Sequence, residues 1–389
     1  MTATQAPPPK SLLGRHRLLA PTAAIKVSPI CLGAMNFGES WKHMLGECSK
    51  ETAFEMLDYF YEQGGNFIDT AVNYQYGESE EWLGEWMQKT GRRDEMVIAT
   101  KYTGSYMSRY GDKMQLSNFA GNSTKNMLLS IEKSLKSLQT SYIDLYYVHV
   151  WDYTISIPEL MTSLNNLVVS GKVLYLGISD TPAWIVVKCN DYARQHGLRQ
   201  FSVYQGRWSA AERDFERDII PMCKDEGMAI APWGALGGGL FKPKDQIGKD
   251  GGRNTLLAKT GKEELVTEVL EKIAKKKGTI VTSVAFAYVM HKAPYVFPIC
   301  GGRKVEHLKG NIEALGLRLS QEEIDEIDTG YPFELGFPYT FLAGRNKMIQ
   351  GPEDVSLNTR AGYFDYVKGP QPIPPHQGPL DTQTAPPGP

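Results

Sequence analysis

Eight short apolar segments alternate with helical segments along this chain, and that alternation limits the folds it can adopt. Each apolar segment is followed by a stretch with helical spacing of its apolar residues, at intervals of roughly 30–40 residues. The apolar segments lack polar alternation, as in a parallel sheet that helices cover on both faces. The expected strands span residues 28–36, 64–74, 96–101, 142–150, 173–180, 201–205, 228–233 and 295–300. The expected helices span residues 50–63, 78–89, 123–138, 157–170, 213–226, 263–276, 281–291, 305–315 and 320–328, and another starts near Pro182.

This pattern favours an α/β fold of the (β/α)8 TIM-barrel type, in a single domain with a C-terminal extension. A doubly wound open sheet is the alternative, but no GxGxxG segment follows the first expected strand. We expect the barrel over residues 16–345, after a disordered N-terminus at residues 1–15. Residues 346–389 form a proline-rich extension that we expect to be partly disordered.

Some local features add detail to this outline. Residues 12–27 are expected to form a short hairpin or an irregular lead-in to the barrel. Ser320 and Glu323 have the spacing of a capping box at the start of the last expected helix. The segment after Tyr331 is aromatic and contains two prolines, and we expect it to lie over the mouth of the barrel.

The composition excludes several classes of protein. The formal net charge of -2 does not favour a nucleic-acid partner or an anionic membrane surface. No apolar run reaches the roughly 18 residues that a membrane span needs, and the N-terminus lacks the features of a secretory signal. The five scattered cysteines indicate neither a disulfide framework nor a metal site. We therefore expect a cytoplasmic protein.

Three successive expected strands end in a residue with a titratable side chain. These residues are Asp69, Lys101 and His149, and Tyr74 follows Asp69 in the next loop. The carboxyl ends of barrel strands meet at one face, and adjacent strands lie about 4.8 Å apart. Each residue alone is more often structural, as a turn cap, a packed aromatic, a surface lysine or a core histidine. Their coincidence at neighbouring strand ends favours a shared catalytic pocket.

These four residue types suit the reduction of a carbonyl group. The alkoxide that forms when a ketone or aldehyde receives a hydride needs a proton, which Tyr74 can donate. An ammonium group at Lys101 favours the phenolate and so eases proton donation. Asp69 holds the charge and orientation of Lys101, while His149 hydrogen-bonds the carbonyl oxygen and orients the substrate.

The second half of the chain carries features of a nucleotide site. Ser179 and Asp180 end one strand, where they can bond a carboxamide, and Trp233 ends another, where its ring can stack on a flat ring. The glycines after Trp233 let backbone amides approach a pyrophosphate, although such a run also suits a flexible turn. Arg303 and Lys304 precede a helix start and indicate an anion site. Two cations there suggest an extra phosphate, and therefore NADPH rather than NADH.

The chain resembles the aldo-keto reductase superfamily, and most of all its fungal branch of aryl-alcohol dehydrogenases and norsolorinic-acid-reductase-type enzymes. The resemblance rests on GGNFIDTAVNYQYGESEEWLG, the strand that ends in Lys101, YIDLYYVHVWD, GKVLYLGISD, the YQ pair at 204–205, APWGALGGG and PICGGRKVEHLKGNIEAL. These segments occur in the family's order across nearly all of residues 28–328. The resemblance implies that Asp69, Tyr74, Lys101 and His149 form the catalytic tetrad, with Tyr74 as the general acid and base.

The resemblance also implies the residues that bind NADP(H) and the substrate. The expected NADP(H)-binding residues are Asp69, Ser179, Asp180, Gln205, Trp233, Gly234, Ala235, Leu236, Gly237, Gly238, Gly239, Leu240, Lys244, Gly302, Arg303, Lys304, His307 and Asn311. The expected substrate-binding residues are Tyr74, His149, Trp41 and Trp151, beside the loop at residues 102–122 and the tail after Tyr331. Two positions depart from many relatives: Asp180 stands where they carry asparagine, and Gly310 where they carry glutamate.

We therefore expect an NADPH-dependent reductase of a small aldehyde or ketone, reversible with the alcohol. The aromatic residues expected around the substrate favour an aromatic or polycyclic compound, and the resemblance suggests fungal secondary metabolism. The alternatives are a reductase-like redox-sensing regulatory subunit and a general aryl-alcohol dehydrogenase or detoxification enzyme. Family members occur as monomers and as homo-oligomers, so the sequence leaves the oligomeric state open.

Overall fold

The computed structural model describes residues 6–241 and 261–382 of the chain. Within these ranges, eight parallel strands form one sheet in the order β10-β3-β4-β5-β6-β7-β8-β9. The strands are β3 (Cys31–Gly33), β4 (Phe67–Asp69), β5 (Val97–Tyr102), β6 (Ile143–Val148), β7 (Val173–Ser179), β8 (Phe201–Arg207), β9 (Ala229–Trp233) and β10 (Ile299–Gly301). Lys244, predicted to bind the cofactor, lies outside the described residues.

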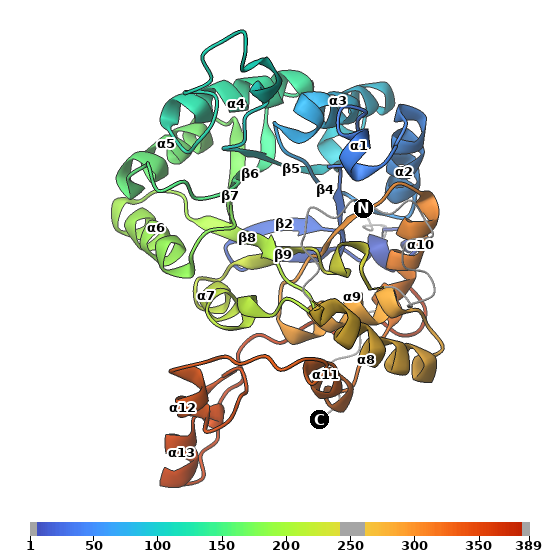
Figure 1. Cartoon of the computed structure of the whole chain (residues 1–389), viewed down its shortest axis with the longest axis vertical. Coiled ribbons are helices and arrows are strands. Elements are labelled where there is room, and N and C mark those ends of the chain that lie inside the picture. The colour runs from blue at the N-terminus through green and yellow to red at the C-terminus, as the bar shows by residue number, and fades with distance from the viewer. Residues whose placement is uncertain (1–5, 242–260, 383–389) are drawn as a thin grey trace, which may run out of the picture.

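The sheet closes on itself between β9 and the residues just before β10. Ile230 pairs in parallel with Val296. The backbone N–H of Ile230 donates to the oxygen of Tyr295 at 2.9 Å, and that of Phe297 donates to the oxygen of Ile230 at 2.9 Å. Figure 1 shows the strands at the centre with helices around them. The predicted TIM barrel is therefore confirmed, and the doubly wound alternative is wrong.

Helices cover the outside of the barrel, and a short helix, α1 (Lys42–Leu45), lies in the loop after β3. The covering helices are α2 (Lys50–Glu62), α3 (Glu78–Thr90), α4 (Thr124–Ser137), α5 (Ile157–Val169), α6 (Ala183–His196), α7 (Ile219–Asp225), α8 (Lys262–Lys277), α9 (Val281–Lys292), α10 (Val305–Glu313) and α11 (Gln321–Asp328). Among the described residues, no helix is both long and apolar enough to span a membrane.

Side-chain caps fix where several of these helices begin. Ser49, Ser123 and Ser156 each accept a backbone N–H at the start of α2, α4 and α5. The predicted capping box of Ser320 and Glu323 is confirmed at α11. By contrast, α7 is shorter than the predicted helix at residues 213–226, since residues 214–216 form a separate 3-10 turn.

A hairpin of β1 (Arg17–Ala20) and β2 (Ala23–Val27) closes the amino-terminal end of the barrel, so the structure shows the first of the two forms expected for this segment. Its buried side chains pack in one cluster with residues in the first half of the barrel strands, including Phe67, Val97 and Val203. This end is therefore filled by apolar side chains. The opposite end, where the strands finish, is the one left for a site.

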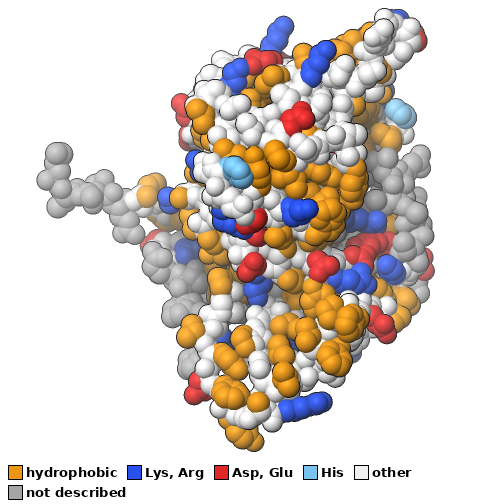
Figure 2. All heavy atoms as spheres, turned by 90° about the vertical axis from the view of Figure 1, so that its left-hand side faces the viewer, with side chains coloured by type: hydrophobic (Ala, Val, Ile, Leu, Met, Phe, Trp, Pro, Cys, Tyr) orange, Lys and Arg blue, Asp and Glu red, His pale blue; other side chains and the backbone are white. Residues whose placement is uncertain are grey.

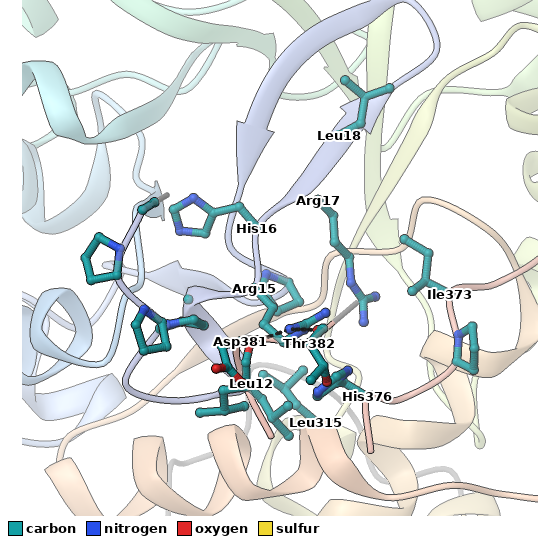
Figure 3. Close-up of a pocket in the computed structure, with 18 residues that line it drawn as sticks. Leu12, Arg15, His16, Arg17, Leu18, Leu315, Ile373, His376, Asp381 and Thr382 are labelled. Carbon is teal, nitrogen blue, oxygen red and sulfur yellow. Dashed lines mark hydrogen bonds between the residues drawn. The ribbon is translucent and has the colours of Figure 1, made fainter. Parts of the chain in front are cut away.

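The two terminal segments meet beside the hairpin around a hollow of about 490 Å3 (Figure 3). The guanidinium of Arg15 donates to the carbonyl oxygens of Leu380 at 2.6 Å and Thr382 at 2.8 Å. Ser11 donates to the carbonyl oxygen of Gln63 at 2.8 Å, and the side chain of Leu13 is fully buried. The prediction of disorder is thus wrong for residues 11–15, because Leu13 contributes to the core.

The C-terminal extension does not lie over the barrel mouth as predicted. Its helices α12 (Tyr339–Ala343) and α13 (Ser356–Ala361) project away from the barrel in Figure 1. The extension is fastened near α7, where Tyr339 donates to Asp218 at 2.5 Å and Arg217 donates to the carbonyl oxygen of Glu334 at 2.7 Å. These contacts hold the start of the extension beside the N-terminus of α7, from which α12 and α13 extend outward (Figure 1).

A buried ionic cluster joins the loop after β8 to α9 and α11. Glu216 is 1% exposed and accepts from Arg213 at 2.8 Å and from Lys292 at 3.0 Å. Lys292 also donates to Asp328 at 2.8 Å. Burial opposes the charge of Glu216, but the two cations outweigh it and lower the pKa of this carboxyl. Each member of the cluster therefore depends on its partners.

We expect Glu216→Ala to lower the free energy of unfolding by about 3–5 kcal/mol, because two cations lose their buried partner. Asp214→Ala is the matched control: it removes an exposed carboxylate that pairs with Arg217 in the same segment. This control should cost less than about 1 kcal/mol. Urea unfolding of both variants is the measurement, and equal shifts of the midpoint would contradict the role of the cluster.

Candidate active site

The carboxyl ends of β4, β5 and β6 bring the predicted tetrad together. The ammonium of Lys101 donates to Asp69 at 2.5 Å and to the carbonyl oxygen of Thr70 at 2.7 Å. It also lies 3.5 Å from the hydroxyl of Tyr74. The ring of Tyr74 meets that of His149 edge-on, with 5.8 Å between the ring centroids. The four side chains therefore form one cluster, as the strand ends predicted.

Burial sets the protonation of this cluster. Burial raises the pKa of Tyr74, and the charge of Lys101 only limits that rise, so the phenol is protonated near neutral pH. Burial opposes the charge of Lys101, but Asp69 and Tyr74 outweigh it and raise the pKa of this ammonium. Burial, with help from Lys101, lowers the pKa of His149 to about 3. The site thus combines a protonated phenol, an ammonium, a carboxylate and a neutral imidazole.

The backbone after Tyr74 adopts an unusual conformation that the sequence did not predict. Gln75 and Tyr76 both have φ of 55°, in the left-handed region that non-glycine residues seldom adopt. The Gln75 side chain is buried, accepts from the N–H of Trp41 at 2.6 Å and donates to the oxygen of Met35 at 3.0 Å. Gln75 thereby places the ring of Trp41 6.2 Å from that of Tyr74.

Two further residues that sequence reasoning missed fix α3 against the strands. Ser79 lies 2.9 Å from the hydroxyl of Thr70 and donates to the oxygen of Ala34 at 2.8 Å. Thr100 donates to the buried Glu80 at 2.6 Å. Thr70 and Thr100 adjoin Asp69 and Lys101 in the chain, so α3, and with it the turn that carries Tyr74, is held in register with the tetrad. Both Ser79 and Glu80 are polar residues buried in α3. A polar residue on the apolar face of an expected helix is the sequence signal that could have indicated these contacts.

The strand ends of β7, β8 and β9 place the predicted nicotinamide residues beside the tetrad. Gln205 donates to Asp69 at 2.9 Å. The indole N–H of Trp233 donates to Asp180 at 3.3 Å. Although Asp180 is exposed as a whole residue, partial desolvation of its carboxyl group raises its pKa to about 6, against the opposing effect of the hydrogen bond from Trp233.

These residues fit a nicotinamide nucleotide. The Ser179 hydroxyl is buried and forms no hydrogen bond of normal geometry with the described residues, although it lies near enough to Asp180 to affect its pKa. A buried hydroxyl without a partner suits a ligand amide. Gly234, Gly237 and Gly239 all have positive φ, and a Cβ atom on Gly239 would meet nothing within 4 Å. This open backbone suits the close approach of a phosphate.

The predicted nucleotide residues from 302 to 311 lie just before and within α10. Lys304 is the N-cap residue of that helix, and Asn311 is buried within it. The guanidinium of Arg303 packs closely against Gly46. A Cβ atom at that position would come within 1.9 Å of the guanidinium, so a larger residue would displace it. A Cβ atom on Gly302 would contact His307. Cations and backbone N–H groups at a helix start form a site suited to an anion.

The loop at residues 102–122 is fastened beside His149. The N–H of Asn122 donates to Asp152 at 2.7 Å, and the side chain of Asn122 donates to Thr103 at 3.0 Å. The backbone N–H of His149 also donates to Thr103 at 3.3 Å, so these bonds hold the two ends of the loop against the strand end that carries His149. Trp151 is the other predicted substrate residue in this region. Its ring lies edge-on to the ring of the exposed Tyr153, with 6.3 Å between the ring centroids.

Comparison with known proteins agrees with this geometry. An aryl-alcohol dehydrogenase of Pestalotiopsis microspora is 59% identical over 98% of this chain and 98% of its own length. Norsolorinic acid reductase B of Dothistroma septosporum is 58% identical over 92% of this chain and 94% of its own. An aryl-alcohol dehydrogenase (NADP(+)) of Phanerodontia chrysosporium is 48% identical over 96% and 98%. The model of the Aldo/keto reductase family matches residues 29–331. The chain therefore belongs to the aldo/keto reductase family and is an oxidoreductase.

Proposed function

We propose that this chain is an NADPH-dependent reductase that converts an aromatic or polycyclic aldehyde or ketone to the alcohol. The observation that carries the proposal is the position of the Lys101 ammonium, bonded to Asp69 at 2.5 Å and 3.5 Å from the Tyr74 hydroxyl. The names of the relatives, aryl-alcohol dehydrogenase and norsolorinic acid reductase, support an aromatic substrate and a place in fungal secondary metabolism. The indole of Trp41 beside Tyr74 supports it further.

In this proposal Tyr74 is the proton donor. A nicotinamide nucleotide bound beside Ser179 and Gln205 supplies the hydride. The carbonyl oxygen takes up the proton of the Tyr74 hydroxyl as its negative charge develops, and Lys101 stabilises the phenolate that remains. The neutral imidazole of His149 donates a hydrogen bond to the same oxygen and orients the carbonyl. In the reverse direction the phenolate takes the proton back from the alcohol.

We expect Tyr74→Phe to lower kcat/KM for carbonyl reduction by at least about 10²–10⁴-fold, the usual contribution of a general acid. Tyr76→Phe is the matched control, since it removes the hydroxyl of the next tyrosine in the same turn and keeps the ring beside Trp41. NADPH oxidation over a panel of aromatic carbonyls is the measurement. Unchanged turnover in Tyr74→Phe would refute the assignment, and a wild-type chain that turns over no carbonyl would favour a redox-sensing subunit.

The preference for NADPH depends on Arg303 and Lys304 in this proposal. Charged hydrogen bonds contribute about 1.5–3 kcal/mol each, so the double variant Arg303→Ala/Lys304→Ala should weaken NADPH binding by more than about tenfold. NADH binding should change little. Lys309→Ala is the control, because Lys309 lies in the same helix over the ring of Tyr59. Titration of tryptophan fluorescence measures both affinities, and an equal loss for both nucleotides would refute this role.

We expect the imidazole of His149 to stay neutral from pH 5 to pH 8, because burial and Lys101 lower its pKa to about 3. The folded state binds fewer protons at this residue than the unfolded state, whose histidine has a pKa of about 6.5. Its neutral form therefore favours folding above pH 6.5, and that contribution falls as the pH drops towards 3.

Ring chemical shifts of His149 across this pH range, measured by NMR, test that expectation. Lys101→Met should raise the pKa of His149, because it removes a nearby positive charge. A ring that titrates between pH 5 and pH 8 in the wild-type chain would show that the imidazole is not held neutral.

A further inference from the structure

The extension carries a cluster of exposed apolar side chains on an arm that leaves the barrel. We define the arm as residues 337–364, which include α12 and α13. Phe337 is 84% exposed, Phe341 74% and Leu357 73%, and the neighbouring Tyr363 is fully exposed. Figure 2 shows hydrophobic side chains gathered at the lower end of the molecule, where Figure 1 places α12 and α13.

The exposed apolar area of this cluster is large compared with the apolar patches of a typical monomer. Its members are Phe337, Phe341, Leu342, Leu357, Tyr363 and Phe364, with exposed fractions from 38% to complete. At roughly 150–250 Å2 for each large side chain, the cluster exposes about 600–1,100 Å2 of mostly apolar surface. The largest apolar patch of a typical monomer is about 300–600 Å2, and larger patches mark interaction sites. A standard interface buries about 800 Å2 on each partner, so the arm alone provides that area.

The arm has the order and the charge that contact between identical copies requires. Its two helices pack against each other, and the ring of Phe337 lies 6.4 Å from that of Phe341. Lys347 pairs with Asp354 inside the arm at 2.8 Å. The arm contains three basic and two acidic side chains, so its net charge is small and two copies of it repel each other little. A surface of one charge sign would instead repel its own copy.

We propose that two copies of this chain associate through the arm, each covering the apolar cluster of the other in a two-fold symmetric dimer. In such an interface the same patch is used on both subunits, so the protruding arm of one lies against the arm of its partner. The tetrad stays at the mouth of each barrel, away from the arm, so the dimer forms without occupying the proposed site. The proposal is independent of the reaction that the site catalyses.

The test uses the full chain and a double variant, Phe341→Glu/Leu357→Glu, which places one carboxylate on each helix of the arm. Both side chains are exposed, so the variant should fold normally. Trp184→Glu is the matched control, because Trp184 is a large apolar side chain, 59% exposed, on α6. Sedimentation velocity at micromolar concentration measures the mass, and the aromatic-carbonyl assay measures kcat/KM.

We expect the wild type and Trp184→Glu to sediment at twice the 43.4 kDa of one chain. The double variant should sediment as a monomer, with a dimer dissociation constant raised about a hundredfold or more and kcat/KM unchanged. A monomeric wild type would overturn the proposal, and so would a double variant that remains a dimer. A monomeric wild type that binds phospholipid vesicles through the arm would assign the cluster to a membrane surface and also overturn it.

Discussion

The site depends on one buried carboxylate, Asp69. A fully buried ammonium such as that of Lys101 is tolerated only when an anion and further hydrogen bonds compensate the loss of water. Asp69 supplies the anion with one oxygen and accepts the amide of Gln205 with the other. The same side chain therefore joins the end of β5, which carries the tetrad lysine, to the end of β8, on the proposed nucleotide side. The bond to Gln205 is the contact of Asp69 that the sequence did not indicate.

The barrel and the meeting of Asp69, Lys101 and His149 at one face could be predicted because both follow from local patterns. Unbroken apolar segments such as 142–150 are read from a few neighbouring residues, and parallel order follows from their alternation with helices. Once the strands are known, the fold itself brings their carboxyl ends to one face. The convergence of Asp69, Lys101 and His149 therefore required no long-range contact to be predicted. In the structure Lys101 lies 2.5 Å from Asp69, and the ring of His149 lies against that of Tyr74.

The rest depended on contacts that no local pattern records. Nothing in the sequence near Gln75 indicates a left-handed backbone, because the Gln75 side chain is held by backbone groups of Met35 and Trp41. The course of the extension likewise depends on Asp218 and Arg217, more than a hundred residues earlier in the chain. The order of residues 11–15 depends on Leu13 reaching the core. In each case a partner distant in the sequence determines the conformation. Intrinsic secondary-structure propensities carry no information about such partners.

The position of Asp180 shows how burial can alter the meaning of a substitution. Asparagine, which the resemblance led us to expect there, can both donate and accept a hydrogen bond, whereas an ionised aspartate only accepts. Burial raises the pKa of Asp180 to about 6, so near this pH part of the population carries an O–H that can donate. The indole of Trp233 occupies one of its oxygens. The aspartate therefore keeps, over a limited pH range, the donor capacity that the amide of asparagine has at every pH.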